Sequence, residues 1–251
     1  MQGSRLQREH YRRLALSRRP TRLLFSCGWA ERFDPFLLDS RPLLTRFYED
    51  LAARLFTRGD ERVLDVGCGT GLYYPVFAPR VGSIVGIDIS PEMLEAGKGM
   101  LVSKGIRNVE MSLGSAEDPG PLDGPFDIVI GMDLLHHVED VSRMVSAIHP
   151  ILTPHGRLAL LEPNIWNPLM FAAHLIPREE RLALLRHRRS LAYRQLASRF
   201  RLESTVFLNH ITSRQPGWLV RPIQALFRAL EATPLRAFSL RFLLTWRKIE
   251  P

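Results

Sequence analysis

The segment Val63–Gly71, which reads VLDVGCGTG, constrains the fold of this chain more than any other part of it. A short apolar strand runs directly into a glycine-rich loop, and a helix-like segment follows. Glycine permits a tight turn at such a junction and lets a ligand approach the backbone where a side chain would block it. The segment therefore predicts a strand, loop and helix unit of an α/β protein, with a ligand site at the end of the strand.

From Arg62 onward, short β-rich apolar runs alternate with helix-like segments, as in a parallel sheet that helices cover on both faces. Strands are expected at Arg62–Val66, Ser83–Asp88, Val109–Leu113, Phe126–Gly131, Arg157–Glu162, Arg201–Asn209 and Arg241–Lys248. Helices are expected at Leu72–Ala78, Pro91–Lys104 and Val141–Leu152. The pattern predicts an α/β fold with a Rossmann-like, seven-stranded, mostly parallel sheet and helices on both of its faces.

Three regions exceed this minimal layout. Residues 1–60 are expected to form an N-terminal basic segment with cap helices, and residues 61–251 the core. Within the core, helical insertions are expected near 164–200 and 212–236, where apolar residues recur at helical spacing. These insertions are interpreted as lids over a ligand site, and packing onto the core is the alternative for each.

Composition and charge bear on the cellular compartment of the chain and on its binding partners. Two cysteines in 251 residues cannot build a disulfide framework, which favours a reducing, cytoplasmic location. No apolar run is long enough for a membrane-spanning helix. The net charge of +8 is concentrated in two Arg-rich segments, at 1–22 and 178–201. They indicate either a genome that favours arginine or surfaces that meet something anionic, such as lipid headgroups; for the first segment, an organellar transit peptide is a further alternative.

Asp88 refines the nature of the ligand. It closes the second expected strand, where a carboxylate is placed to accept hydrogen bonds from both hydroxyls of a ribose. The loop spacing is G-x-G-x-G with Asp65 two residues ahead of it, and this departs from the G-x-G-x-x-G spacing that cradles a pyrophosphate. A nucleoside ligand without a diphosphate is indicated, and a nicotinamide-dependent oxidoreductase is disfavoured.

With these motifs the chain resembles the class I S-adenosylmethionine-dependent methyltransferases, in particular their small-molecule and quinone-biosynthesis branch. The resemblance extends from about Arg62 to Glu162. It implies an enzyme that uses S-adenosyl-L-methionine as its cofactor, transfers the methyl group by direct displacement and needs no metal. It also implies the residues that surround the cofactor, which are Asp65, Gly67, Cys68, Gly69, Gly71, Asp88, Ile89, Met93, Ser115, Ala116 and Met132.

The third family landmark, Gly114–Asp118, departs from the pattern, because Ser115 stands where relatives often have an aspartate at the adenine edge. Ala116 is expected to serve there through its backbone N–H. Cys68 is expected to be a small packing residue of the loop rather than a nucleophile.

The fourth expected strand ends at the reaction centre, since ligands of open α/β sheets lie beyond the carboxyl ends of the strands. An oxygen or nitrogen acceptor loses a proton around the transfer, and His136 is the preferred general base. The alternative for His136 and for His137 is a structural role in the helix that follows. Asp133, His137 and Glu162 are expected to contact the acceptor.

The acceptor is expected to be a small, hydrophobic or lipid-like molecule, because the insertions add aromatic residues that are flanked by arginines. Peripheral contact with a membrane through the Arg-rich segments is part of this hypothesis. Two alternatives stay open: a cofactor-binding but non-catalytic regulatory or assembly protein, and a nucleic-acid methyltransferase. The second is disfavoured, since aromatic residues are sparse in both basic segments.

Overall fold

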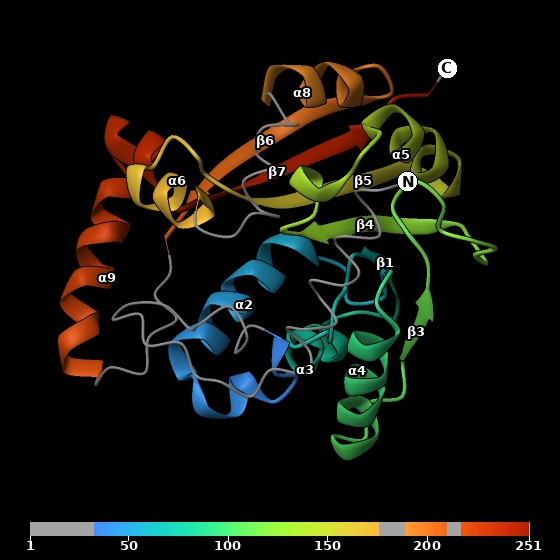
Figure 1. Ribbon diagram of the computed structural model, residues 1–251, viewed down its shortest axis with the longest axis horizontal. Coiled ribbons are helices and arrows are strands. Elements are labelled where there is room, and N and C mark those ends of the chain that lie inside the picture. The colour runs from blue at the N-terminus through green and yellow to red at the C-terminus, as the bar shows by residue number, and fades with distance from the viewer. Residues whose placement is uncertain (1–32, 176–188, 210–216, 251) are drawn as a thin grey trace.

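The computed structural model describes residues 33–175, 189–209 and 217–250. A seven-stranded sheet with the order β3-β2-β1-β4-β5-β7-β6 runs through its centre (Figure 1). Its strands are β1 (Arg62–Val66), β2 (Ser83–Asp88), β3 (Val109–Leu113), β4 (Phe126–Met132), β5 (Leu152–Pro163), β6 (Phe200–Leu208) and β7 (Arg241–Lys248). Only β7 runs antiparallel to its neighbours, β5 and β6. The expected mostly parallel, Rossmann-like sheet is confirmed.

Helices cover both faces of the sheet (Figure 1). One face carries α2 (Pro42–Leu55), α3 (Tyr74–Phe77) and α4 (Pro91–Ser103) over an apolar layer. The other face carries α5 (Val141–Ile148) and α8 (Arg189–Ala197) over a second layer. Short 3-10 turns complete the layers: η2 (Leu37–Ser40), η3 (Ala78–Arg80), η4 (Leu135–His137) and η5 (His149–Ile151).

Local sequence explains where these helices begin. Pro42 starts α2, whose buried residues recur at helical spacing. The side chain of Ser90 accepts a hydrogen bond from the backbone N–H of Met93 and caps α4. The side chain of Asp140 caps α5 in the same way by accepting from the N–H of Arg143. These caps fix the helices that follow β2 and β4, and so fix the loops that lead into them.

The helix expected at Val141–Leu152 is too long. It ends at Ile148, and the next residues form the η5 turn. Pro150 lies in this turn, and proline has no N–H to donate to a continuing helix. Strand β5 begins at Leu152, earlier than the expected Arg157, and its pairing to β4 has an irregularity.

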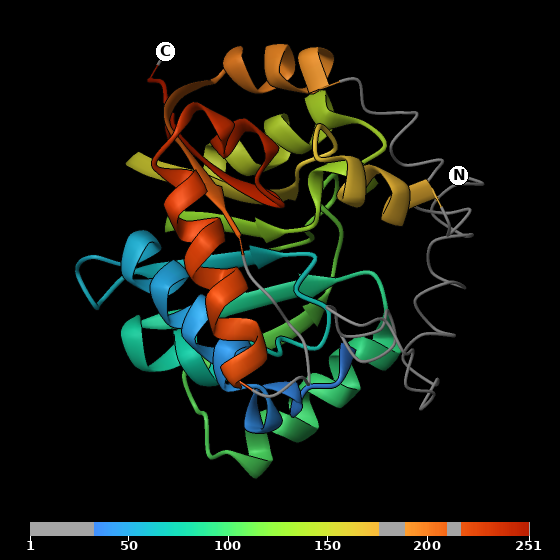
Figure 2. The ribbon, with the colours of Figure 1, turned by 90° about the vertical axis from the view of Figure 1, so that its left-hand side faces the viewer.

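The insertions contribute α6 (Pro168–Leu175), α9 (Gly217–Glu231) and η6 (Pro234–Phe238). Helix α9 lies alongside α2 in both ribbon views, and Arg228 pairs with Asp50 across them (Figures 1 and 2). The first Arg-rich segment and part of the second lie outside the described residues. No helix in the described ranges is long and apolar enough to cross a bilayer. The domain division at residue 60 stays a prediction.

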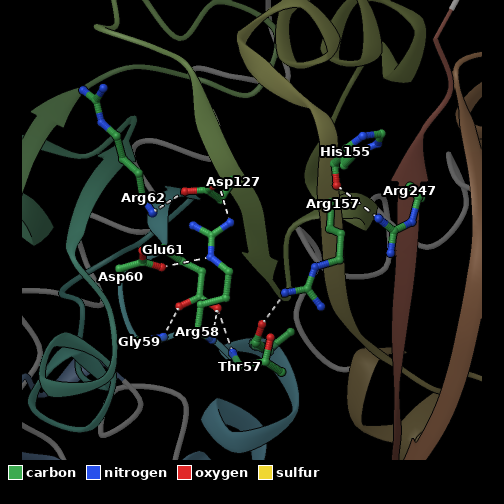
Figure 3. A network of polar contacts seen from close by, with 11 residues as sticks. Thr57, Arg58, Gly59, Asp60, Glu61, Arg62, Asp127, His155, Arg157 and Arg247 are labelled. Atoms are coloured by element: carbon green, nitrogen blue, oxygen red, sulfur yellow. Dashed lines mark hydrogen bonds and ion pairs between the residues drawn. The ribbon is translucent and has the colours of Figure 1, made fainter.

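The edge of the sheet where the parallel strands begin is held by a polar network (Figure 3). The buried carboxylate of Glu61 accepts hydrogen bonds from the backbone N–H groups of Thr57, Arg58 and Gly59. The Asp127 carboxylate accepts from the backbone N–H of Arg62 and from the Arg58 side chain. These contacts fix the turn between α2 and β1 to the start of β4. The functional residues expected from the sequence lie at the opposite edge.

Candidate active site

The glycine loop after β1 exposes its backbone. Gly67 and Gly69 have φ angles of 72° and 56°, in the left-handed region that favours glycine. The N–H groups of Gly67 and Cys68 donate to the carbonyl of Ile87, which ties the loop to the end of β2. At Gly69 the closest atom to a hypothetical Cβ belongs to Phe33, 4.0 Å away. A ligand can therefore approach the backbone at this position.

Asp65, on β1 just ahead of the loop, is fully buried. Its Oδ2 accepts hydrogen bonds from the hydroxyls of Tyr73 and Tyr74, at 2.7 Å and 2.9 Å. Its Oδ1 is buried and has no hydrogen-bond partner among the described residues. Burial raises the pKa of Asp65 to about 7, although the two tyrosine hydroxyls act to lower it, and the nearby charge of Asp88 raises it further. The loop thus encloses an acceptor oxygen that lacks a donor.

Tyr74 occupies space that a side chain at Gly71 or Gly86 would fill. A Cβ at Gly71 would lie 2.3 Å from the Tyr74 ring, and one at Gly86 would lie 2.2 Å from the Tyr74 hydroxyl. Gly71, expected to contact the cofactor, thus has a packing function. The contacts of Asp65 with Tyr73 and Tyr74 were not expected, although the signal was present: both tyrosines open the segment after the loop.

Asp88 ends β2 beside the loop. Its Oδ2 accepts from the Gly69 N–H at 2.8 Å and its Oδ1 from the Ser90 N–H at 2.9 Å. Burial raises the pKa of Asp88, and hydrogen bonds from the N–H groups of Ser90, Gly69 and Ile89 oppose that rise. The side chain is partly exposed and each oxygen retains acceptor capacity, so it is placed to receive hydroxyl donors.

The other expected cofactor residues surround this edge with different exposures. Met93 and Ala116 are buried, whereas Ile89, Ser115 and Met132 are partly exposed. The Ser115 hydroxyl accepts a hydrogen bond from the N–H of Asp118, so the hydroxyl is engaged within its own turn. Cys68 is buried, and burial raises the pKa of its thiol well above the ordinary value. Its thiol is therefore protonated, as suits a packing residue rather than a nucleophile.

His136 and Glu162 form a buried pair where β4 and β5 end. The His136 Nδ1 lies 2.8 Å from Oε2 of Glu162. The other oxygen, Oε1, accepts from the backbone N–H groups of Leu134 and Leu135. The His137 ring lies beside that of His136, with centroids 4.1 Å apart. Both oxygens of Glu162 thus contact protein groups, which orients His136 and the loop after β4. The expected contact of Glu162 with the acceptor stays a prediction.

Asp133 lies between β4 and this loop in an unusual conformation. Its φ is 55°, in the left-handed region, and its backbone N–H donates to the carbonyl of Leu161. Its Oδ1 pairs with the Nη1 of Arg241 on β7. Left-handed backbone at a non-glycine residue costs free energy and is concentrated at functional sites. Arg241 was not expected at this site.

The β1 glycine loop, the acid at the end of β2 and the polar groups after β4 and β5 lie at one edge of a mostly parallel sheet. This arrangement defines the class I methyltransferase fold. A family model described as "Methyltransferase domain" matches residues 58–213. The chain therefore belongs to the methyltransferase domain family, the class I S-adenosylmethionine-dependent methyltransferases, and the resemblance is confirmed.

Curated relatives match part of this chain. A ubiquinone biosynthesis O-methyltransferase from Xanthomonas axonopodis pv. citri (strain 306) is 34% identical over 132 residues, 52% of this chain and 54% of that protein. The aklanonic acid methyltransferase DauC from Streptomyces sp. (strain C5) is 36% identical over 106 residues, 41% of this chain and 48% of that protein. The chain spans about half the length of the curated relatives it matches first.

A solved structure agrees with the fold along nearly the whole chain. The N-methyltransferase NodS from Bradyrhizobium japonicum WM9, in complex with S-adenosyl-L-homocysteine, superposes with a TM-score of 0.60. The match covers 97% of this chain and 98% of that chain at 15% sequence identity. At this identity the match shows the shared fold.

The residues present fit S-adenosylmethionine, the cofactor of this family. The unpartnered Oδ1 of Asp65 and the Asp88 carboxylate offer acceptors to the donors and positive charge of such a ligand. The open backbone at Gly69 leaves space for a close approach. Within the described ranges, no cluster of His, Cys, Asp and Glu could hold a metal ion.

Proposed function

We propose that this chain catalyses methyl transfer from S-adenosylmethionine to a small, apolar acceptor by direct displacement. One observation carries the proposal: a buried histidine and carboxylate pair, His136 and Glu162, lies at the sheet edge that carries the glycine loop. Bound S-adenosylmethionine supplies an electrophilic methyl group on a sulfonium. The contribution of the protein is then to bind, to orient and to handle a proton.

Cofactor binding is assigned to the loop and to the ends of β1 and β2. Asp88 would accept hydrogen bonds from the ribose hydroxyls, while Asp65 would face the methionyl part. Gly67 and Gly69 would admit the ligand to the backbone. Ile89, Met93 and Ala116 would line the adenine, joined by Ser115. Met132 would lie between the cofactor and the acceptor.

Proton transfer is assigned to His136. With Nδ1 held by Glu162, Nε2 is the ring nitrogen that would take the proton of the acceptor. The Glu162 carboxylate stabilises the imidazolium that results, as the carboxylate does in a catalytic triad. Glu162 is therefore a positioning residue, and His137 and Asp133 would lie against the acceptor.

The relatives and the surface beside the site support this class of acceptor. Two of the relatives are named for aklanonic acid and for ubiquinone biosynthesis, which points to a small organic acceptor. Exposed apolar side chains lie on the insertions near Asn164, which is two residues after Glu162. They are Trp166, Phe171, Leu235 and Phe238. An acceptor drawn from an apolar phase, such as a lipid surface, suits this setting.

Calorimetric titration with S-adenosylmethionine and S-adenosylhomocysteine tests the cofactor. We expect micromolar binding that Asp88→Ala weakens at least about tenfold, because the ribose hydroxyls lose a charged acceptor. Asp123→Ala, which removes an exposed carboxylate elsewhere, is the matched control and should bind like the parent protein. Folded protein that binds neither ligand would contradict the proposal.

A further inference from the structure

Arg241 occupies a junction of three strands. It is the first residue of β7 and pairs in register with Pro163, at the end of β5, and with Leu208, at the end of β6. Because β7 is antiparallel to both neighbours, its beginning lies at the edge where the parallel strands end. Arg241 therefore lies at the catalytic edge, beside the strand that carries Glu162.

The guanidinium of Arg241 is buried and only partly satisfied. The residue is 7% exposed. Within the described part of the chain, its side chain has one polar contact, from Nη1 to Oδ1 of Asp133. A guanidinium has five N–H donors in a fork that matches a carboxylate through two parallel hydrogen bonds. The N–H groups that do not contact Asp133 are therefore the donors that Arg241 would offer to a ligand.

The backbone that leads into Arg241 is fixed from two sides. The Asn164 side chain donates to the carbonyls of Ala237 and Ser239, at 2.7 Å and 2.8 Å. The Asn209 side chain accepts from the N–H of Leu240 at 2.9 Å and donates to the Ser239 hydroxyl. Asn164 is itself buried. The position of Arg241 is thus set before any ligand arrives, which lowers the entropic cost of binding one.

We propose that Arg241 is a specificity-determining residue that binds a carboxylate of the acceptor, so that the substrate is an apolar molecule bearing a carboxylate. This inference rests on the proposed function and names the chemical class of its acceptor. This carboxylate is a recognition group, and it accepts hydrogen bonds from the Arg241 N–H groups that Asp133 does not use. Asp133 competes for the same guanidinium and so sets how strongly an anion binds.

A pair of isosteric probes tests the inference: 2-naphthoate and the neutral 2-naphthalenemethanol, titrated into the full chain saturated with S-adenosylhomocysteine. We expect 2-naphthoate to bind at least about tenfold more tightly than the alcohol. Arg241→Gln should abolish this preference. Asp133→Asn should increase it, because the guanidinium loses its competing carboxylate while asparagine still tolerates the left-handed backbone.

Arg247→Gln is the matched control, since Arg247 lies on the same strand and pairs with Glu203 away from the site. It should keep the preference of the parent protein. Equal affinity for the two probes, no binding of 2-naphthoate to folded protein, or a preference that survives Arg241→Gln would overturn the inference. An Asp133→Asn variant with unchanged preference would also do so. Binding of S-adenosylhomocysteine in the same samples reports separately on the proposed function.

Discussion

Asp65 is a carboxyl group that folding removes from water, at the point where a cationic ligand is expected. Its pKa of about 7 lies well above the ordinary 3.8. Below pH 4 the group is neutral in both the folded and the unfolded chain. Between pH 4 and 7 it ionises in the unfolded chain first, so the free energy of unfolding falls as the pH rises. Above pH 7 this reduction is constant.

Asp65→Asn should therefore remove a pH dependence. We expect the free energy of unfolding of the parent protein to fall between pH 4 and 7 by up to about 4 kcal/mol relative to the variant, because asparagine carries no charge. Urea unfolding at several pH values measures this difference. Asp123→Asn should follow the parent protein. Parallel pH profiles for Asp65→Asn and the parent protein would show that Asp65 does not titrate in this range.

His136 gives the corresponding prediction for catalysis. His136→Gln should lower kcat by about 10²- to 10⁴-fold, the usual contribution of a general base. Its affinity for S-adenosylhomocysteine should stay within about twofold. The rates are measured with an apolar acceptor that the parent protein methylates in a screen. His155→Gln, at an exposed histidine, is the control. Full activity in His136→Gln would assign the histidine a structural role.

The turn between α2 and β1 depends on one side chain. Burial alone would raise the pKa of Glu61, yet backbone N–H groups of Arg58, Thr57 and Gly59 donate to its carboxylate and hold the pKa below the ordinary value (Figure 3). The resulting stabilisation is complete above the unfolded pKa and is lost as the pH falls through the lower, folded pKa.

Glu61→Gln should destabilise the protein by about 2 kcal/mol at neutral pH. An amide accepts hydrogen bonds on one side only, and its NH2 group would face an N–H donor of the turn. Chemical denaturation at pH 7 and in mild acid measures the effect, which should shrink in acid. Glu110→Gln, at an exposed position of β3, should change little. An equal loss in both variants would contradict the role of the turn.

Hydrophobic pattern and turn chemistry predict most elements, and long-range pairing decides the rest. The observed bounds of β1, β2, β3 and β7 are those expected from the sequence. The pair of His136 and Glu162 was predictable in outline, since Glu162 lies near the end of β5 and His136 follows β4, its parallel neighbour. The pair of Asp133 and Arg241 was not, because its residues are 108 positions apart and meet only through the antiparallel insertion of β7. No local signal specifies that insertion.

The whole molecule presents an apolar surface beside its catalytic edge. Trp166 is 66% exposed and Phe238 is 55% exposed, on segments joined by the hydrogen bond from the Asn167 side chain to the Phe238 carbonyl. Arg236, which is also exposed, lies in the same turn as Phe238, η6. A surface that combines aromatic and basic side chains is suited to anionic lipid headgroups and acyl chains.

Sedimentation with phosphatidylglycerol vesicles tests this surface. We expect the parent protein to sediment with these vesicles more than with phosphatidylcholine vesicles. The double variant Trp166→Ser and Phe238→Ser should lose most of this binding. The matched control is Val102→Ser and Leu113→Ser, which removes exposed apolar side chains on α4 and β3. Equal loss in both double variants, or no vesicle binding by the parent protein, would contradict a specific lipid-facing surface.

The return of β7 along β6 has a consequence for how such a protein diversifies. Segment 209–240 leaves the sheet and re-enters it at the same edge, and Asn209 joins its two ends through Ser239 and Leu240. The described residues between these ends, 217–238, can change in length or sequence without moving a strand, because Asn209 closes the segment at its base. Under the proposed function, the residues assigned to the cofactor can thus stay unchanged while this segment, beside the acceptor side, is replaced. Exchanging this segment between relatives would therefore test whether it sets substrate preference while the sheet stays in place.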